Sequence, residues 1–141
     1  MPPGANLPLP PAQQPTAPAI PYTGDRTQVQ LDSDRIIAHG SLPDTTAVLL
    51  YTVPDQTSVE IREWWFSNSD GVAARTVSIY IVAPGDSAAS TNIFIPAFSI
   101  PLAEYSILQS RTALEPGWSI WGVADDGDKV NYHISGVEAV R

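Results

Sequence analysis

Short apolar runs separated by polar turns dominate the chain from residue 27 onward. The runs are rich in β-branched and aromatic residues, and Gly, Pro, Asp, Asn and Ser cluster between them, which is the pattern of an all-β domain. They predict eight or nine strands, with candidates at residues 27–31, 35–39, 47–53, 58–67, 75–82, 92–100, 105–112, 118–124 and 129–140.

Alternation within the runs predicts which face of each strand is buried, because successive side chains in a strand point to opposite sides. In residues 75–82, Val77, Ile79 and Ile81 share one parity, so that face should lie on the core. In the last run the inward parity reverses across Gly136. This reversal predicts a bulge in that strand.

Three segments depart from simple alternation. Residues 47–53 are apolar on both parities at nearly every position, as expected of a central strand or of one at a subunit interface. Pro96 and Pro101 make residues 92–100 an edge strand or an interrupted one, because proline cannot donate to a ladder. Residues 101–115 also fit helical spacing, but we favour a strand there.

Residues 1–24 differ from the rest of the chain. They carry no charge and hold eight of the fourteen prolines, so they should favour polyproline II and cannot sit inside a helix or a sheet. Fully extended, such a segment reaches roughly 70 Å. A disordered tail is one interpretation; we favour an assembly arm, 1–24, followed by a β-sandwich domain, 25–141. Its apolar side chains would then contact a partner: Leu7, Leu9, Ile20 and Tyr22.

Composition excludes several classes of function. The 141 residues carry a formal net charge of -8, which argues against nucleic acid or an anionic membrane as a partner. The chain has no Cys, which removes disulfides, thiolate zinc sites and thiol nucleophiles. No apolar run is long enough for a membrane span, and the amino terminus lacks the pattern of a signal peptide.

Ser87 is the one candidate nucleophile. Gly85-Asp86-Ser87 matches the start of the nucleophile block of one class of serine esterases, in which the serine needs a histidine base. That class places a helix after the serine, whereas here the segment joins two strand-like runs. Neither His39 nor His133 has the expected context, so we interpret Ser87 as part of a polar turn and expect no catalytic residue.

Asp125, Asp126 and Asp128 form the densest acidic cluster. Calcium accepts clustered oxygen ligands of this kind, but the spacing is not that of an EF-hand. A solvated hairpin turn is the favoured interpretation, and no metal or cofactor is expected.

Tryptophans are the remaining candidates for binding. Trp64 and Trp65 are adjacent in a predicted strand, so they must point to opposite faces, and one of them should reach a surface. There it could pack structurally, anchor a subunit contact or stack on a sugar ring. Both are retained as candidate partner-binding residues.

Several short motifs resemble the small β-sandwich virion proteins of tailed bacteriophages, a group that includes head-decoration (cement) proteins and tail or fibre modules. The resemblance spans about residues 45–140. The motifs are Leu50-Tyr51-Thr52-Val53-Pro54, Ser58-Val59-Glu60-Ile61 leading to Ser67-Asn68, Val77-Ser78-Ile79-Tyr80-Ile81-Val82, Leu114-Glu115-Pro116-Gly117 before Ser119-Ile120-Trp121, and Ile134-Ser135-Gly136-Val137-Glu138.

The resemblance implies an antiparallel, jelly-roll-like β-sandwich that works without catalysis or cofactor. It implies a place in the virion, on the capsid surface or in the tail, and a homotrimer bound to the major capsid protein or another virion protein. We therefore expect a capsid decoration protein that uses its proline-rich arm as a clamp. The alternative is a tail, fibre or baseplate module that binds host glycan through an exposed tryptophan.

Overall fold

The computed structural model describes residues 34–140, which form eight strands and one short 3-10 turn. The expectations for the arm, including Leu7, Leu9, Ile20 and Tyr22, and for a strand at 27–31 lie outside the described residues. Among the described residues, no helix is long and apolar enough to cross a membrane. The elements are β1 (Arg35–Ser41), β2 (Val48–Thr52), β3 (Thr57–Asn68), β4 (Arg75–Val82), η3 (Ser90–Asn92), β5 (Ile93–Ile100), β6 (Tyr105–Leu114), β7 (Ser119–Ala124) and β8 (Val130–Val140).

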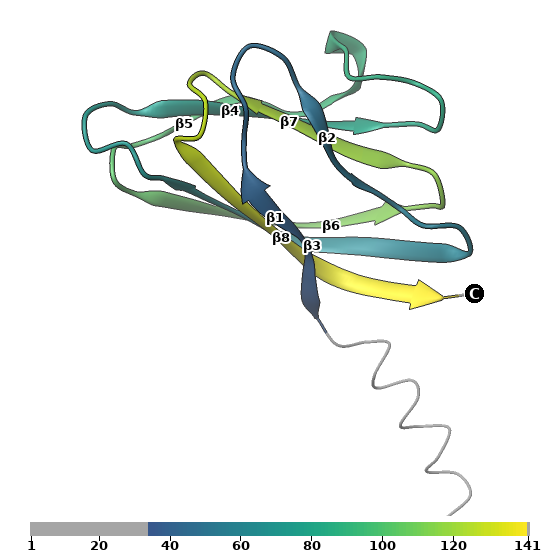
Figure 1. The fold of residues 1–141 in the computed structure, drawn as a ribbon. Coiled ribbons are helices and arrows are strands. Elements are labelled where there is room, and N and C mark those ends of the chain that lie inside the picture. The colour runs from purple at the N-terminus through teal and green to yellow at the C-terminus, as the bar shows by residue number, and fades with distance from the viewer. Residues whose placement is uncertain (1–33, 141) are drawn as a thin grey trace, which may run out of the picture. The chain divides into compact units, whose positions relative to one another are not determined.

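The strands form two four-stranded antiparallel sheets that pack face to face (Figure 1). The first sheet has the order β1-β8-β3-β6 and the second β2-β7-β4-β5. Each sheet alternates strands from early and late in the chain, as in a jelly roll with two Greek keys. The predicted all-β, jelly-roll-like sandwich is therefore confirmed, and so is a strand at residues 105–114.

Inward-facing side chains of both sheets make one core. Trp64 and Phe66 of β3 are fully buried, as are Val77 and Ile79 of β4, and Ile81 packs against the same cluster. The alternation in β4 thus predicted its buried face correctly. The removal of these apolar side chains from water on folding is the main stabilising contribution to such a sandwich.

A row of bulges crosses the first sheet next to Gly136. The strand pairing passes over one extra residue in β1, Ile37, and one in β3, Arg62. In β8 the same set of alternate residues faces the core before and after Gly136. Beyond the glycine, Glu138 pairs with the buried Val59, and paired residues point to the same side of a sheet. The bulge predicted within β8 is wrong: the extra residues lie in the two strands that flank it.

Glycine at position 136 permits this arrangement. A Cβ placed there would lie 2.1 Å from the Glu60 carbonyl oxygen of β3. The bulged backbone of β3 therefore approaches β8 more closely than any side chain at residue 136 would allow.

β2 is an edge strand, so the expectation of a central strand is wrong. Its apolar residues on both parities have a different cause, because the pairing with β7 passes over Leu50 as an extra residue. The bulge lets both Leu50 and Tyr51 pack against the core. Val48 and Leu49 stay 40% and 51% exposed, and whether they meet another subunit stays a prediction.

β5 is the other edge of the second sheet, as the prolines predicted. Pro96 lies where the pairing with β4 shifts register between Ile95 and Phe98. Proline has no backbone N–H to donate. This is tolerated in an edge strand, because its outer side has no neighbouring strand that would accept the hydrogen bond.

Candidate functional site

A row of aromatic and apolar side chains crosses the solvent face of the first sheet. His39, His133, Trp65 and Ile107 are aligned in register across β1, β8, β3 and β6. The ring centroids of Trp65 and His133 are 5.1 Å apart, and those of Trp65 and Tyr105 are 6.1 Å apart. We call these five residues the aromatic row; Tyr105 and Ile107 are 61% and 46% exposed in it.

The bulge at Arg62 determines which tryptophan joins this row. It reverses the parity of β3, so that Trp64 and Phe66 turn inward and Trp65 turns outward. Trp64 is fully buried, and its indole N–H donates to Ser110 Oγ at 2.9 Å. The expectation that Trp64 binds a partner is therefore wrong, because its side chain is part of the core. Trp65 is the half-buried member of the pair.

Beside Trp65 the same face forms a shallow hollow of about 330 Å³. Polar groups line it, including Ser67 and the pair in which Ser41 Oγ donates to Asn131 Oδ1 at 2.7 Å. Neither the hollow nor the aromatic row contains a carboxylate, although the chain has 15 acidic residues. On the same side of β3, Glu63 lies two residues before Trp65, so the area without carboxylates is confined to the hollow and the aromatic row.

A second candidate surface is an apolar groove between the edge strands β5 and β6, with a volume of about 430 Å³. Ile93 and Phe94 are 40% and 39% exposed along it. Local sequence patterns do not reveal this groove, because its two walls belong to different sheets. The apolar run before Pro96 was the available signal. The lining residues are Ile81, Asn92, Ile93, Phe94, Thr112, Ala113, Leu114, Glu115 and Trp118.

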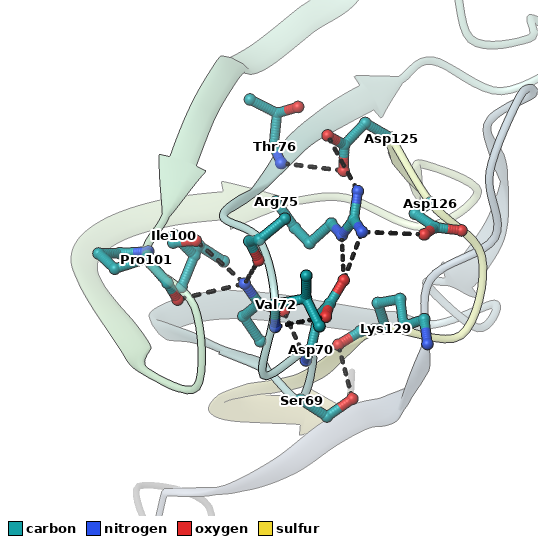
Figure 2. Close-up of polar contacts among 12 residues, drawn as sticks. Ser69, Asp70, Val72, Arg75, Thr76, Ile100, Pro101, Asp125, Asp126 and Lys129 are labelled. Atoms are coloured by element: carbon teal, nitrogen blue, oxygen red, sulfur yellow. Dashed lines mark hydrogen bonds and ion pairs between the residues drawn. The ribbon is translucent and has the colours of Figure 1, made fainter.

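The acidic turn after β7 is held by an arginine. Figure 2 shows Arg75 at the start of β4 between Asp70 and the Asp125–Asp126 turn. Arg75 Nε donates to Asp70 Oδ2 at 2.9 Å, and Nη2 lies 3.1 Å from Asp126 Oδ2. Asp125 Oδ1 accepts from the Thr76 N–H at 3.1 Å. Two of the three carboxylates considered for calcium, Asp125 and Asp126, thus already face a guanidinium cation.

The contact between Asp70 and Arg75 favours the charged form of both side chains. The hydrogen bond from Arg75, with that from the Val72 N–H, holds the pKa of Asp70 below its usual value, and Asp70 in turn raises the pKa of Arg75. Among the described residues, no group of three His, Asp or Glu side chains is arranged to hold a metal ion. The cluster ties the β3–β4 loop to the β7–β8 turn, which is a structural role.

Ser87 lies in the exposed connection between β4 and β5. Its carbonyl oxygen accepts a hydrogen bond from Asn92 Nδ2 at 2.9 Å. His39 and His133 lie on β1 and β8 of the other sheet, where their rings face each other at 5.7 Å. The structure does not bring Ser87 together with either histidine.

A side-chain contact between β2 and β8 is one of the polar links between the two sheets. The Tyr51 hydroxyl of β2 donates to Glu138 Oε1 of β8 at 3.3 Å, and Arg35 pairs with the same carboxylate. Burial, with a smaller effect of the Glu138 charge, raises the pKa of Tyr51 to about 12.

Comparisons with family models and with curated proteins found no match. Among solved structures, chains of two virus particles and a viral coat protein are similar to this chain. A chain of the infectious bursal disease virus T13 particle has 9% identity and a TM-score of 0.47, with 79% of this chain and 31% of that chain covered. This chain therefore spans about a third of that viral chain.

Two further similar chains are of comparable length. The tobacco streak virus coat protein has 10% identity and a TM-score of 0.42, with 76% of this chain and 86% of that chain covered. A chain of the Israeli acute paralysis virus full particle has 10% identity and a TM-score of 0.41, with 92% and 86% covered. At this level of identity, function has to be argued from the residues of this chain.

Proposed function

We propose that the protein is a non-enzymatic virion structural protein that decorates the capsid, most simply as a homotrimer, and binds the major capsid protein. The observation that carries the proposal is the aromatic row: five aromatic or apolar side chains gathered on the solvent face of one sheet, reaching across its four strands. Contiguous exposed groups of this kind mark interaction surfaces on monomeric folds.

The chemistry of the row suits a protein partner. Tyrosine and tryptophan combine a large apolar area with a polar tip and few rotatable bonds, so they are frequent anchors at protein interfaces. The hollow beside Trp65 contains no carboxylate, although the chain has 15 acidic residues. Jelly rolls occur in viral capsids and in lectins, so the fold is compatible with this function without requiring it.

Replacing the central residue of the row tests the proposal. Trp65→Ala should lower occupancy on purified particles about tenfold or more, the loss expected for an anchor worth at least 1.4 kcal/mol. Val72→Ala is the control, since Val72 is an 85% exposed apolar residue in the loop between β3 and β4, outside the row. Equal occupancy of the two variants would contradict a role for the row.

Truncation tests the arm separately. A chain without residues 1–24 should fold and keep its oligomeric state but bind particles more weakly, because fewer contacts act together. Unchanged occupancy would remove the clamp from the proposal. Sedimentation of the full chain decides whether the oligomer is a trimer.

The second candidate is a tail, fibre or baseplate module that binds host glycan. The hollow beside Trp65 favours it, because hydroxyl, amide and imidazole groups surround an aromatic side chain, the combination that binds sugar rings. A glycan array probed with the full chain and with Trp65→Ala tests this. Signal that survives the substitution, or no signal at all, would count against it.

A further inference from the structure

We propose that the apolar groove between β5 and β6 binds the segment Leu7–Pro11 of a neighbouring copy of the chain. The inference rests on the proposed function, in which copies lie side by side on a particle, and it identifies the surface that receives the proline-rich residues.

The groove has the composition of a binding site for proline-rich segments. Phe94 and Trp118 contribute aromatic walls, and Ile81, Ile93 and Leu114 contribute aliphatic ones. Segments in polyproline II conformation dock in aromatic-lined grooves of this type, because the preformed helix loses little entropy on binding. The exposed fractions of Ile93 and Phe94, 40% and 39%, leave two of these walls open to a ligand.

Trp118 adds a hydrogen-bond donor. Its indole N–H has no hydrogen-bond partner among residues 34–140, whereas Trp64 and Trp121 donate to Ser110 and Ser119. No buried side-chain nitrogen or oxygen in that part of the chain lacks a partner, so the Trp118 N–H is open to solvent. Tryptophan can only donate, and the carbonyl groups of a proline-rich segment can only accept.

Residues 7–11 read Leu-Pro-Leu-Pro-Pro, with prolines at positions 8, 10 and 11. Polyproline II has three residues per turn, so Pro8 and Pro11 would share one face of the segment. The proline nitrogens carry no hydrogen. Their carbonyl oxygens remain as acceptors for a donor such as the Trp118 N–H.

Charge makes this segment the suitable ligand within the chain. All acidic residues lie after residue 24, and residues 1–24 are the longest stretch without charge. Two copies carrying a net charge of -8 repel each other, and Glu115 at the groove would disfavour an acidic ligand. An uncharged segment approaches without this repulsion.

The position of β1 favours a groove on a neighbouring copy. The described chain begins at Asp34, directly before β1, and β1 and β6 are the opposite edges of the first sheet. The chain therefore enters the sandwich at the edge remote from the groove.

Photo-crosslinking with isotope labels tests the proposal on full-length protein. Unlabelled chain with a photoreactive phenylalanine analogue at Leu9 is mixed with an equal amount of ¹⁵N-labelled natural chain, irradiated and digested. We expect crosslinks from the unlabelled segment to labelled peptides that contain Phe94 or Trp118. Crosslinks only within unlabelled material, crosslinks to the aromatic row, or none would overturn the proposal.

Variants supply the controls. Pro8→Ala with Pro11→Ala should lower the yield of groove crosslinks about tenfold, the change given by a loss of 1.4 kcal/mol, whereas Pro2→Ala with Pro3→Ala should leave it unchanged. Trp118→Phe keeps an aromatic wall and removes the donor, so the yield should fall with little change in thermal unfolding. An equal yield from all variants would also overturn the proposal. Occupancy on particles, measured in parallel, reports on the proposed function independently.

Discussion

Trp64 and Trp65 are neighbours in the chain and occupy opposite environments. The Trp64 ring packs against Phe94 with a centroid distance of 5.5 Å, and Trp65 lies on the outer face beside His133 and Tyr105. Because Trp64 and Trp65 are adjacent in a strand, the sequence alone predicts that they point to opposite faces. It could not assign them, because the inward parity of β3 depends on the bulge at Arg62, and β-propensity carries no signal for a single inserted residue.

The two tryptophans should therefore differ in their contribution to stability. Trp64→Ala removes a fully buried ring and leaves the Ser110 hydroxyl without its indole donor, so the free energy of unfolding should fall by about 3–5 kcal/mol. Trp65→Ala should lower the free energy of unfolding clearly less. Denaturant unfolding of the two variants measures the difference, and equal losses would contradict the assignment of Trp64 to the core.

Tyr51 should make stability depend on pH in the alkaline range. Its pKa in the folded protein is about 12, above the value of 10.0 for the free side chain, so folding favours the protonated phenol. This contribution is complete below pH 10.0 and disappears as the pH rises towards about 12.

Tyr51→Phe isolates the effect. The substituted protein should lose less stability than the natural one between pH 10.0 and about 12, as measured by denaturant unfolding. The pKa of Tyr132 is also raised by burial, but this residue is present in both proteins and cancels in the comparison. Parallel pH profiles would contradict the role assigned to Tyr51.

At the scale of elements, strand positions were predictable and strand irregularities were not. Every predicted run between residues 35 and 140 overlaps an observed strand, because turn residues separate the runs. The wrong predictions, β2 as a central strand and a bulge inside β8, share one cause. In both places an extra residue, Leu50 in β2 or Arg62 in β3, alters the relation between parity and burial.

Gly136 offers a test at this scale. Gly136→Ala would place a methyl group 2.1 Å from the Glu60 carbonyl oxygen, and backbone atoms cannot swing aside as a flexible side chain can. The free energy of unfolding should fall by about 3 kcal/mol, the upper end of the range for overpacking. Gly71→Ala is the control, since a Cβ there meets nothing within 4 Å; equal stability of the two variants would contradict the close approach of β3 and β8.

At the scale of the whole molecule, the two candidate surfaces were only partly predictable. Trp65 was a candidate surface residue because it is adjacent to Trp64 in a predicted strand. The aromatic row also requires His39, His133 and Ile107, which come from three other strands. The groove likewise combines β5 and β6 from different sheets. Surfaces assembled from distant segments depend on strand order and register, which local patterns do not determine.

Salt should strengthen association between copies of the chain. Copies with a net charge of -8 repel one another, and at about 1 M salt the screening length falls to roughly 3 Å. If apolar surfaces make the contacts, sedimentation should show larger species at high ionic strength. Dissociation on adding salt would instead indicate that ion pairs hold the copies together.

Pro96 has a further consequence for the exposed edge of the second sheet. An uninterrupted outer strand exposing Ile93 and Phe94 would be a template for the addition of further strands and growth into insoluble fibres. The absent N–H and the shifted register at Pro96 break that template midway along β5. β5 can thus expose apolar side chains without offering a continuous edge to which another strand could pair.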